Sequence, residues 1–190
     1  MRASVRFRRV VWAAAACIAV AIGLAGKLRA DDVPGQVFIS TGETRGVGEQ
    51  YFVDFRARRG ALFGHTFIVY GHLGAKGDLQ GVEYAGNYPA DGNLGLVVGS
   101  VVPVCTTIGP VQDDLKAPAT IIYRRKLTRA QFVQLKAGVR HIRATQHYWH
   151  LMFFNCNDLA VEMTKRVGLR SPSPWLIPHA YVAALREMNP

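Results

Sequence analysis

The sequence has few cysteines, no internal repeat and no low-complexity stretch. Only three cysteines occur among its 190 residues, and Cys17 lies in an N-terminal apolar segment. His147 and His150 could join Cys156 in a metal site, but their spacing fits no common zinc motif and only one thiol would contribute. We therefore expect no metal or other cofactor.

Acidic residues are scarce relative to basic ones, 13 against 23. Such an excess can indicate a nucleic-acid-binding protein. However, residues 1–30 hold six of the basic residues and none of the acidic ones, so the rest of the chain has 17 basic and 13 acidic residues, a net charge of +4. That charge is ordinary for 160 residues, and we expect no nucleic-acid partner.

The chain has one long hydrophobic run, Val10–Gly26, which follows four arginines and contains no charge. With the small residue Ala30 before Asp31, this pattern is typical of a secretory signal peptide over residues 1–30. The protein is then expected to be periplasmic or secreted. The run of 17 residues is near the lower limit for spanning a bilayer, so an uncleaved inner-membrane anchor stays open as its membrane contact.

Residues 31–190 are long enough for one domain with its own core. The first part of this region carries strand patterns, with residues 62–73 and 79–86 forming a hairpin, and residues 106–118 are predicted to be a long loop. The predicted strands are Gln36–Ser40, Gln50–Arg56, Leu62–Leu73, Leu79–Gly86, Leu94–Val104 and Ala119–Leu127.

Helical periodicity begins at Thr128. Thr128 and Gln131 form a capping-box pattern, and an apolar stripe follows from Phe132 to Ile142. A terminal helix is predicted over Pro178–Met188. The order of elements therefore predicts an α+β domain, with an antiparallel sheet formed early and a few helices packed on it.

Cys156 lies where a short apolar run, Leu151–Phe154, turns into a helix. We expect that run to be extended and buried, and we expect Asn155 to cap the helix and Gly168 to end it. A thiol in the first turn meets free N–H groups and the positive end of the helix dipole, which favour a thiolate. The alternatives are a small buried side chain or a disulfide with Cys105.

A nucleophilic cysteine needs a base, and His65 is the strongest of the six histidines. It follows Gly64 near the start of an apolar strand, where a thiolate could satisfy one ring nitrogen and be activated in return. A core histidine bonded to a carbonyl is the alternative. Glu83, on the next strand of the hairpin, could be its cross-strand neighbour and orient the ring, with His72 and Asp158 in reserve.

The strand motif Gly64-His65-Thr66-Phe67 and the helix start Phe154-Asn155-Cys156-Asn157, some ninety residues later, resemble the circularly permuted branch of the NlpC-type papain-like superfamily, which includes lecithin retinol acyltransferase-like proteins. The chain is also similar to uncharacterised exported proteobacterial proteins. The resemblance implies a permuted papain-like fold with Cys156 as nucleophile, His65 as base, and Glu83 or His72 in the third position.

These observations predict an exported cysteine hydrolase that cleaves amide bonds through a Cys-His acyl-enzyme. The resemblance suggests peptides, including cell-wall peptides of peptidoglycan, as substrates. Two alternatives stay open. The same site could transfer the acyl group to an amine or alcohol, or the domain could be a non-catalytic binding or structural part of the envelope.

Overall fold

A computed structural model of the protein describes residues 37–40, 50–60, 63–109, 114 and 116–190. Its centre is a seven-stranded sheet with the order β1-β6-β2-β3-β4-β5-β7, in which β1 and β6 are parallel and the other neighbours antiparallel. The strands are β1 (Val37–Ser40), β2 (Gln50–Arg58), β3 (His65–Leu73), β4 (Leu79–Pro89), β5 (Val104–Gly109), β6 (Ala119–Leu127) and β7 (Tyr148–Trp149).

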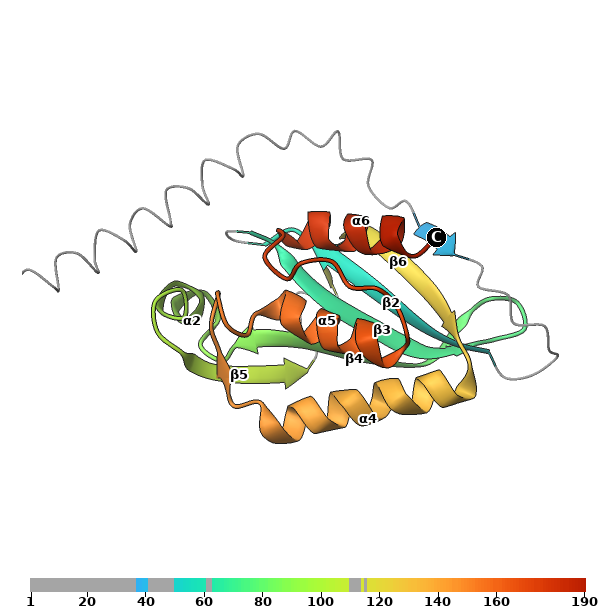
Figure 1. Cartoon of the computed structure of the whole chain (residues 1–190), viewed down its shortest axis with the longest axis horizontal. Helices are drawn as coiled ribbons and strands as arrows, with labels where there is room; N and C mark the ends of the chain where they lie inside the picture. The colour runs from blue at the N-terminus through green and yellow to red at the C-terminus, as the bar shows by residue number, and fades with distance from the viewer. Residues whose placement is uncertain (1–36, 41–49, 61–62, 110–113, 115) are drawn as a thin grey trace, which may run out of the picture. The chain divides into compact units, whose positions relative to one another are not determined.

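Three helices cover one face of the sheet: α4 (Arg129–Thr145), α5 (Cys156–Arg166) and α6 (Pro178–Met188), whereas the short α2 (Gly92–Val98) lies at one end (Figure 1). Side chains from all three long helices pack with inward-facing residues of β2, β3 and β6 in one core cluster. That cluster is drawn from residues 51 to 185. The predicted α+β class, an early sheet with helices added late, is therefore confirmed.

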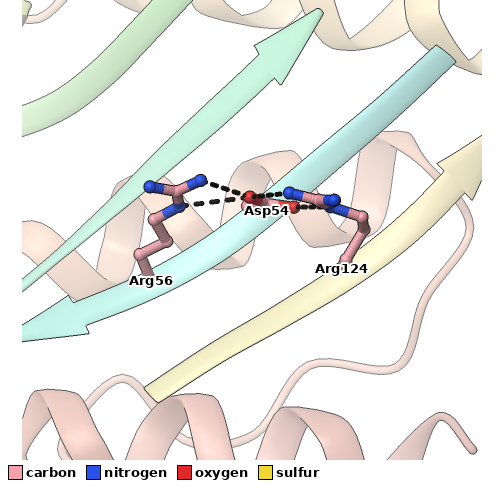
Figure 2. A network of polar contacts seen from close by, with 3 residues as sticks. All are labelled: Asp54, Arg56 and Arg124. Carbon is pink, nitrogen blue, oxygen red and sulfur yellow. Dashed lines mark hydrogen bonds and ion pairs between the residues drawn. The ribbon is translucent and has the colours of Figure 1, made fainter. Parts of the chain in front are cut away.

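The opposite face of the sheet is also buried around β2 and β3. Phe52, Phe67 and Val69 form a second apolar cluster there. Beside it, the fully buried carboxylate of Asp54 accepts hydrogen bonds from Arg56 and Arg124 on its two sides (Figure 2). The apolar environment tolerates the carboxylate because both of its oxygens are paired with guanidinium groups.

Where capping and periodicity agreed, the helices lie as predicted. In α4 the side chain of Thr128 accepts from the Gln131 amide and the Gln131 side chain accepts from the Thr128 amide, and the predicted stripe is buried. The helix α6 spans the predicted residues Pro178–Met188. The strands β3 and β4 form the predicted hairpin, and β6 has the predicted bounds.

The predicted strand Leu94–Val104 is wrong. Residues 92–98 form α2, and the following strand β5 begins only at Val104 and occupies part of the predicted loop 106–118. An apolar run without periodicity does not distinguish a strand from a helix. Tertiary contact favours the helix here. Gly99, at the end of α2, lies against the Trp149 ring, and a Cβ atom at this position would come within 2.6 Å of the indole.

The predicted buried approach to Cys156 is also wrong. Residues 151–153 form a turn, a backbone bridge joins His150 to Phe154 across it, and the Phe153 side chain is 72% exposed. Bulky apolar residues thus face solvent immediately before the helix that carries the cysteine.

The predicted signal peptide or anchor lies outside the described residues. Residues 33–190 form a compact unit of their own. Among the described residues, no helix is both long enough and apolar enough to cross a membrane.

Candidate functional site

The helix α5 begins as the sequence predicts. The side chain of Asn155 accepts a 2.7 Å hydrogen bond from the Asn157 amide, and Asp158 accepts a 2.8 Å hydrogen bond from the Asn155 amide. These two bonds of the reciprocal cap occupy the Asn155 and Asn157 amides, leave the Cys156 amide unused and give Asp158 a structural role. At the other end, Gly168 has a φ of +76°, the left-handed conformation expected after a helix.

The first turn of α5 packs where the sheet opens. The pairing of β3 with β4 ends at Phe67 and Gly86, and β4 then continues alongside β5. Thr66 contacts α5 instead of a β4 partner, because its hydroxyl donates a 2.6 Å hydrogen bond to the side-chain oxygen of Asn157. The Asn157 side-chain amide in turn donates to the carbonyls of Pro174 and Leu176, so one buried side chain joins three segments.

A second buried asparagine, Asn87 on β4, holds the turn that precedes the cysteine. Its side-chain amide donates to the carbonyls of Phe154 and Asn155, each at 3.1 Å, and its oxygen accepts from the Thr106 hydroxyl. The sequence patterns did not identify Asn87 or Thr66 as site residues. For Thr66 the available signal was a polar side chain inside an apolar strand pattern, since such a group is buried only when it has partners. Asn87 lies just beyond the predicted strand Leu79–Gly86, so the pattern gave no such signal for it.

Cys156 is partly exposed as a residue but its thiol group is buried, and the backbone amides of Thr66, Asn157 and Cys156 itself favour the thiolate. Burial of the surroundings nevertheless raises the pKa of Cys156 to about 11, against the lowering effect of these amides. The thiol is therefore protonated at neutral pH in the ligand-free protein, whereas the helix position alone suggested a thiolate.

His65 and Thr66 point to opposite faces of the sheet because side chains alternate along a strand. The His65 ring stacks on Tyr88 with 4.2 Å between centroids and lies near Phe67, away from α5. Its Nε2 is buried and has no hydrogen-bond partner, so no such bond joins it to Cys156. Burial, assisted by the charge of Arg58, lowers the pKa of His65 well below its ordinary value.

Glu83 is not the cross-strand neighbour of His65, contrary to expectation. The register of β4 places it opposite Tyr70, whose hydroxyl donates to it at 3.1 Å, and Lys136 forms an ion pair with it at 2.7 Å. Five residues of strand separate His65 from Tyr70, roughly 17 Å. Burial raises the pKa of Glu83, but hydrogen bonds from Lys136 and Tyr70 outweigh this and lower it overall.

The remaining candidates lie apart from Cys156. His72 belongs to β3 and contacts Tyr51 and Phe132, seven residues along the strand from His65. Cys105 is an exposed free thiol on β5 and forms no disulfide with Cys156. Within the described part of the chain, no group of three His, Cys, Asp or Glu side chains is arranged to hold a metal ion.

Comparison with protein-family models, with curated proteins and with solved structures gave no match to this chain. The site is therefore interpreted from its own geometry. That geometry places a thiol at a helix N-terminus beside backbone amides that favour its thiolate, with a neutral histidine, His65, on the opposite face of β3.

Proposed function

We propose that the protein is an exported thiol acyl-transfer enzyme in which Cys156 attacks an amide or ester carbonyl. The main support is the position of Cys156 in the first turn of a capped helix, where the backbone amides of Thr66, Cys156 and Asn157 favour its thiolate. Amides fixed at a helix N-terminus are suited to hold the oxygen of a tetrahedral intermediate, because they need no rearrangement as negative charge develops.

His65 is the proton acceptor in this proposal. It directly precedes Thr66, whose backbone amide favours the Cys156 thiolate. Its Nε2 is buried without a hydrogen-bond partner, whereas most buried polar atoms have one. The lowered pKa keeps the ring neutral at pH 7, the form that accepts a proton, but burial also makes it a weak base, and its basicity would rise once the ring leaves its buried place beside Tyr88. Catalysis requires the ring to leave Tyr88 and turn toward the opening between β3 and β4. Catalytic hydrogen bonds commonly tighten only when substrate binds.

The reaction would proceed in two steps. The proton of Cys156 passes to His65, and the sulfur adds to the carbonyl carbon while the Thr66 and Cys156 amides donate to the oxyanion. The bond to the leaving amine or alcohol then breaks as His65 returns the proton to it. Water attacks the resulting thioester and releases the acid, and an amine or alcohol in its place would make the protein an acyltransferase.

The order of elements supports a permuted papain-like architecture as part of the same proposal. The strand that carries His65, β3, precedes the helix that carries Cys156, and α5 packs across β3 and β4. The resemblance of the two motifs to the NlpC-type superfamily favours peptide amides, including cell-wall peptides, and an exported location.

Acylation of Cys156 tests the proposal. The chain from residue 31 would be incubated with p-nitrophenyl esters and with cell-wall peptide fragments, and intact-mass spectrometry would locate the adduct. We expect an adduct that Cys156→Ser abolishes and that His65→Gln slows by about a hundredfold or more. His72→Gln, a histidine on the same strand distant from the thiol, is the matched control and is expected to acylate at the wild-type rate.

A non-catalytic envelope domain is the second candidate. One observation favours it: the thiol, with its pKa raised to about 11, has no hydrogen bond to a base in the structure. Absence of any adduct with both substrate classes, or equal acylation of wild type and His65→Gln, would support this candidate and contradict the Cys-His mechanism.

A further inference from the structure

The exposed apolar side chains gather at one end of the domain. Leu94 and Phe153 are 70% and 72% exposed, and Trp175 is 66% exposed. Outside this end, Leu79 and Val133 are the remaining exposed large hydrophobic residues of the described chain. We define the apolar rim as Leu94, Val97, Val98, Val101, Val102, Tyr148, Met152, Phe153, Trp175 and Leu176.

The segments that form the apolar rim are in contact with one another. The Leu151 amide donates to the carbonyl of Gly99, which joins the turn 150–154 to the end of α2. The Asn157 side chain donates to the carbonyls of Pro174 and Leu176, which joins the third segment to the start of α5. In Figure 1, α2 lies at the end of the sheet where α5 begins. The rim therefore borders the N-terminal end of α5.

The charge distribution around the rim is asymmetric. Residues 92–109, which contain α2 and β5, carry no charged side chain. The neighbouring helix α4 contains no acidic residue, and its last turns expose Arg140 and Arg143 shortly before β7. Arg143 also donates to the carbonyl of Tyr84. Of the carboxylates near this end, Glu83 is ion-paired with Lys136 and Asp158 caps α5, which leaves Asp91, just before α2, against these two cations.

We infer that the apolar rim docks on the surface of a lipid bilayer that contains anionic lipid. The aliphatic side chains of α2 and the Phe153 ring would enter the acyl-chain region, Trp175 and Tyr148 would lie at the interface, and Arg140 and Arg143 would face the headgroup phosphates. A bilayer fits this surface because the aliphatic side chains of the rim cannot form hydrogen bonds, and the acyl chains of a bilayer need none. An exposed apolar patch of this kind needs a partner.

The docking inference does not depend on the acyl-transfer proposal. Cys156→Ser is expected to bind vesicles like the wild type, so a failure of catalysis and a failure of docking are distinguishable. The chain from residue 31 is the proper sample, because the apolar run Val10–Gly26 would itself bind vesicles. The core cluster lies wholly within residues 51–185, so this shortened chain retains it.

The test is co-sedimentation with vesicles of phosphatidylcholine, with and without phosphatidylglycerol. The wild type is expected to sediment with vesicles, more strongly when phosphatidylglycerol is present and less strongly at high salt. The double variant Val97→Asp/Phe153→Asp should partition at least about tenfold more weakly, because two apolar groups become charged. Val133→Asp, at an exposed valine on α4 outside the rim, is the matched control and should bind like the wild type.

Three results would overturn the inference. The wild type could remain in the supernatant with both vesicle types, or Val133→Asp could lose as much binding as the double variant. The wild type could also fail to bind vesicles but form a dimer in analytical ultracentrifugation that the double variant abolishes, which would assign the rim to a second copy. Circular dichroism measures the melting temperature of each variant. Equal melting temperatures show that a loss of vesicle binding comes from the changed surface and not from unfolding.

Discussion

The Thr66 hydroxyl donates a 2.6 Å hydrogen bond to the Asn157 side chain, and this bond joins β3 to the first turn of α5. Both residues are buried. Thr66 thus occupies the face of β3 that meets the cysteine helix, whereas His65 occupies the other face. The alignment of α5 on the sheet depends on Thr66, and any catalytic role of His65 requires a change in its side-chain position.

Removal of the Thr66 hydroxyl should destabilise the domain. Thr66→Val keeps the shape but leaves the Asn157 oxygen buried without this donor, which costs about 1–3 kcal/mol in the free energy of unfolding. Urea denaturation measures the change. Thr145→Val, which removes an exposed hydroxyl bond to the His141 carbonyl, is the control and should change stability by less than about 0.5 kcal/mol. Equal losses in the two variants would contradict the role assigned to Thr66.

Loss of the Asn87 side chain should loosen the turn before Cys156. Asn87→Ala leaves the carbonyls of Phe154 and Asn155 without their buried donor, and we expect a loss of about 1–3 kcal/mol. Hydrogen exchange should accelerate in residues 150–156 more than in α4. Asn93→Ala, at an exposed position on α2, should leave both measurements unchanged. Uniform acceleration across the domain would argue against a local clamp.

The buried carboxylate of Asp54 should be the most costly polar side chain to remove. Asp54→Ala leaves Arg56 and Arg124 partly buried without their shared partner, and breaking such a group costs about 3–5 kcal/mol. Denaturant unfolding measures the loss, with Asp78→Ala in the exposed β3–β4 turn as control. A loss of less than about 1 kcal/mol would show that water replaces the carboxylate.

Alkylation of Cys156 in the ligand-free protein should depend steeply on pH. With a pKa raised to about 11, the thiolate fraction, and with it the iodoacetamide labelling rate, should rise about tenfold per pH unit between about pH 7 and pH 10. In the chain from residue 31, which lacks Cys17, Cys105→Ser removes the other thiol from the measurement. A rate that levels off below about pH 8 would show that the thiol is already activated without substrate.

Glu83→Gln should leave acylation of Cys156 unchanged, because Glu83 contacts Tyr70 and Lys136 and not His65. Its lowered pKa implies a small stabilisation that is present above the unfolded pKa and lost as the pH falls through the folded value. The side chain is 41% exposed, so the stability change near neutral pH should stay below about 1 kcal/mol. Acylation slowed as much as by His65→Gln would assign the orienting role to Glu83 after all.

Local rules predicted most of the elements. The caps and apolar stripes of α4 and α5 are short-range features, so Thr128, Asn155 and Gly168 were identified without tertiary information. The helix α2 was missed because its apolar run has no period, and the turn at Phe153 because bulky residues favour burial in general but are exposed here.

The geometry of the candidate site was harder to predict, because it depends on register. A shift of one residue along β3 exchanges the faces of His65 and Thr66. The position of Glu83 depends on the register between β3 and β4. That register shifts between Tyr70 and His72 of β3. Neither property is encoded by local pattern, so the residue types of the site could be predicted but not their contacts.

The reciprocal cap at the start of α5 is built from Asn155, which precedes the helix, and Asp158 in its first turn. No part of it uses the Cys156 side chain. The nucleophile position is consequently free to vary while the helix start is retained. Substitution of Cys156 by serine or alanine therefore removes the proposed nucleophile while both hydrogen bonds of the cap remain, so the chemistry proposed for this turn is separable from helix initiation.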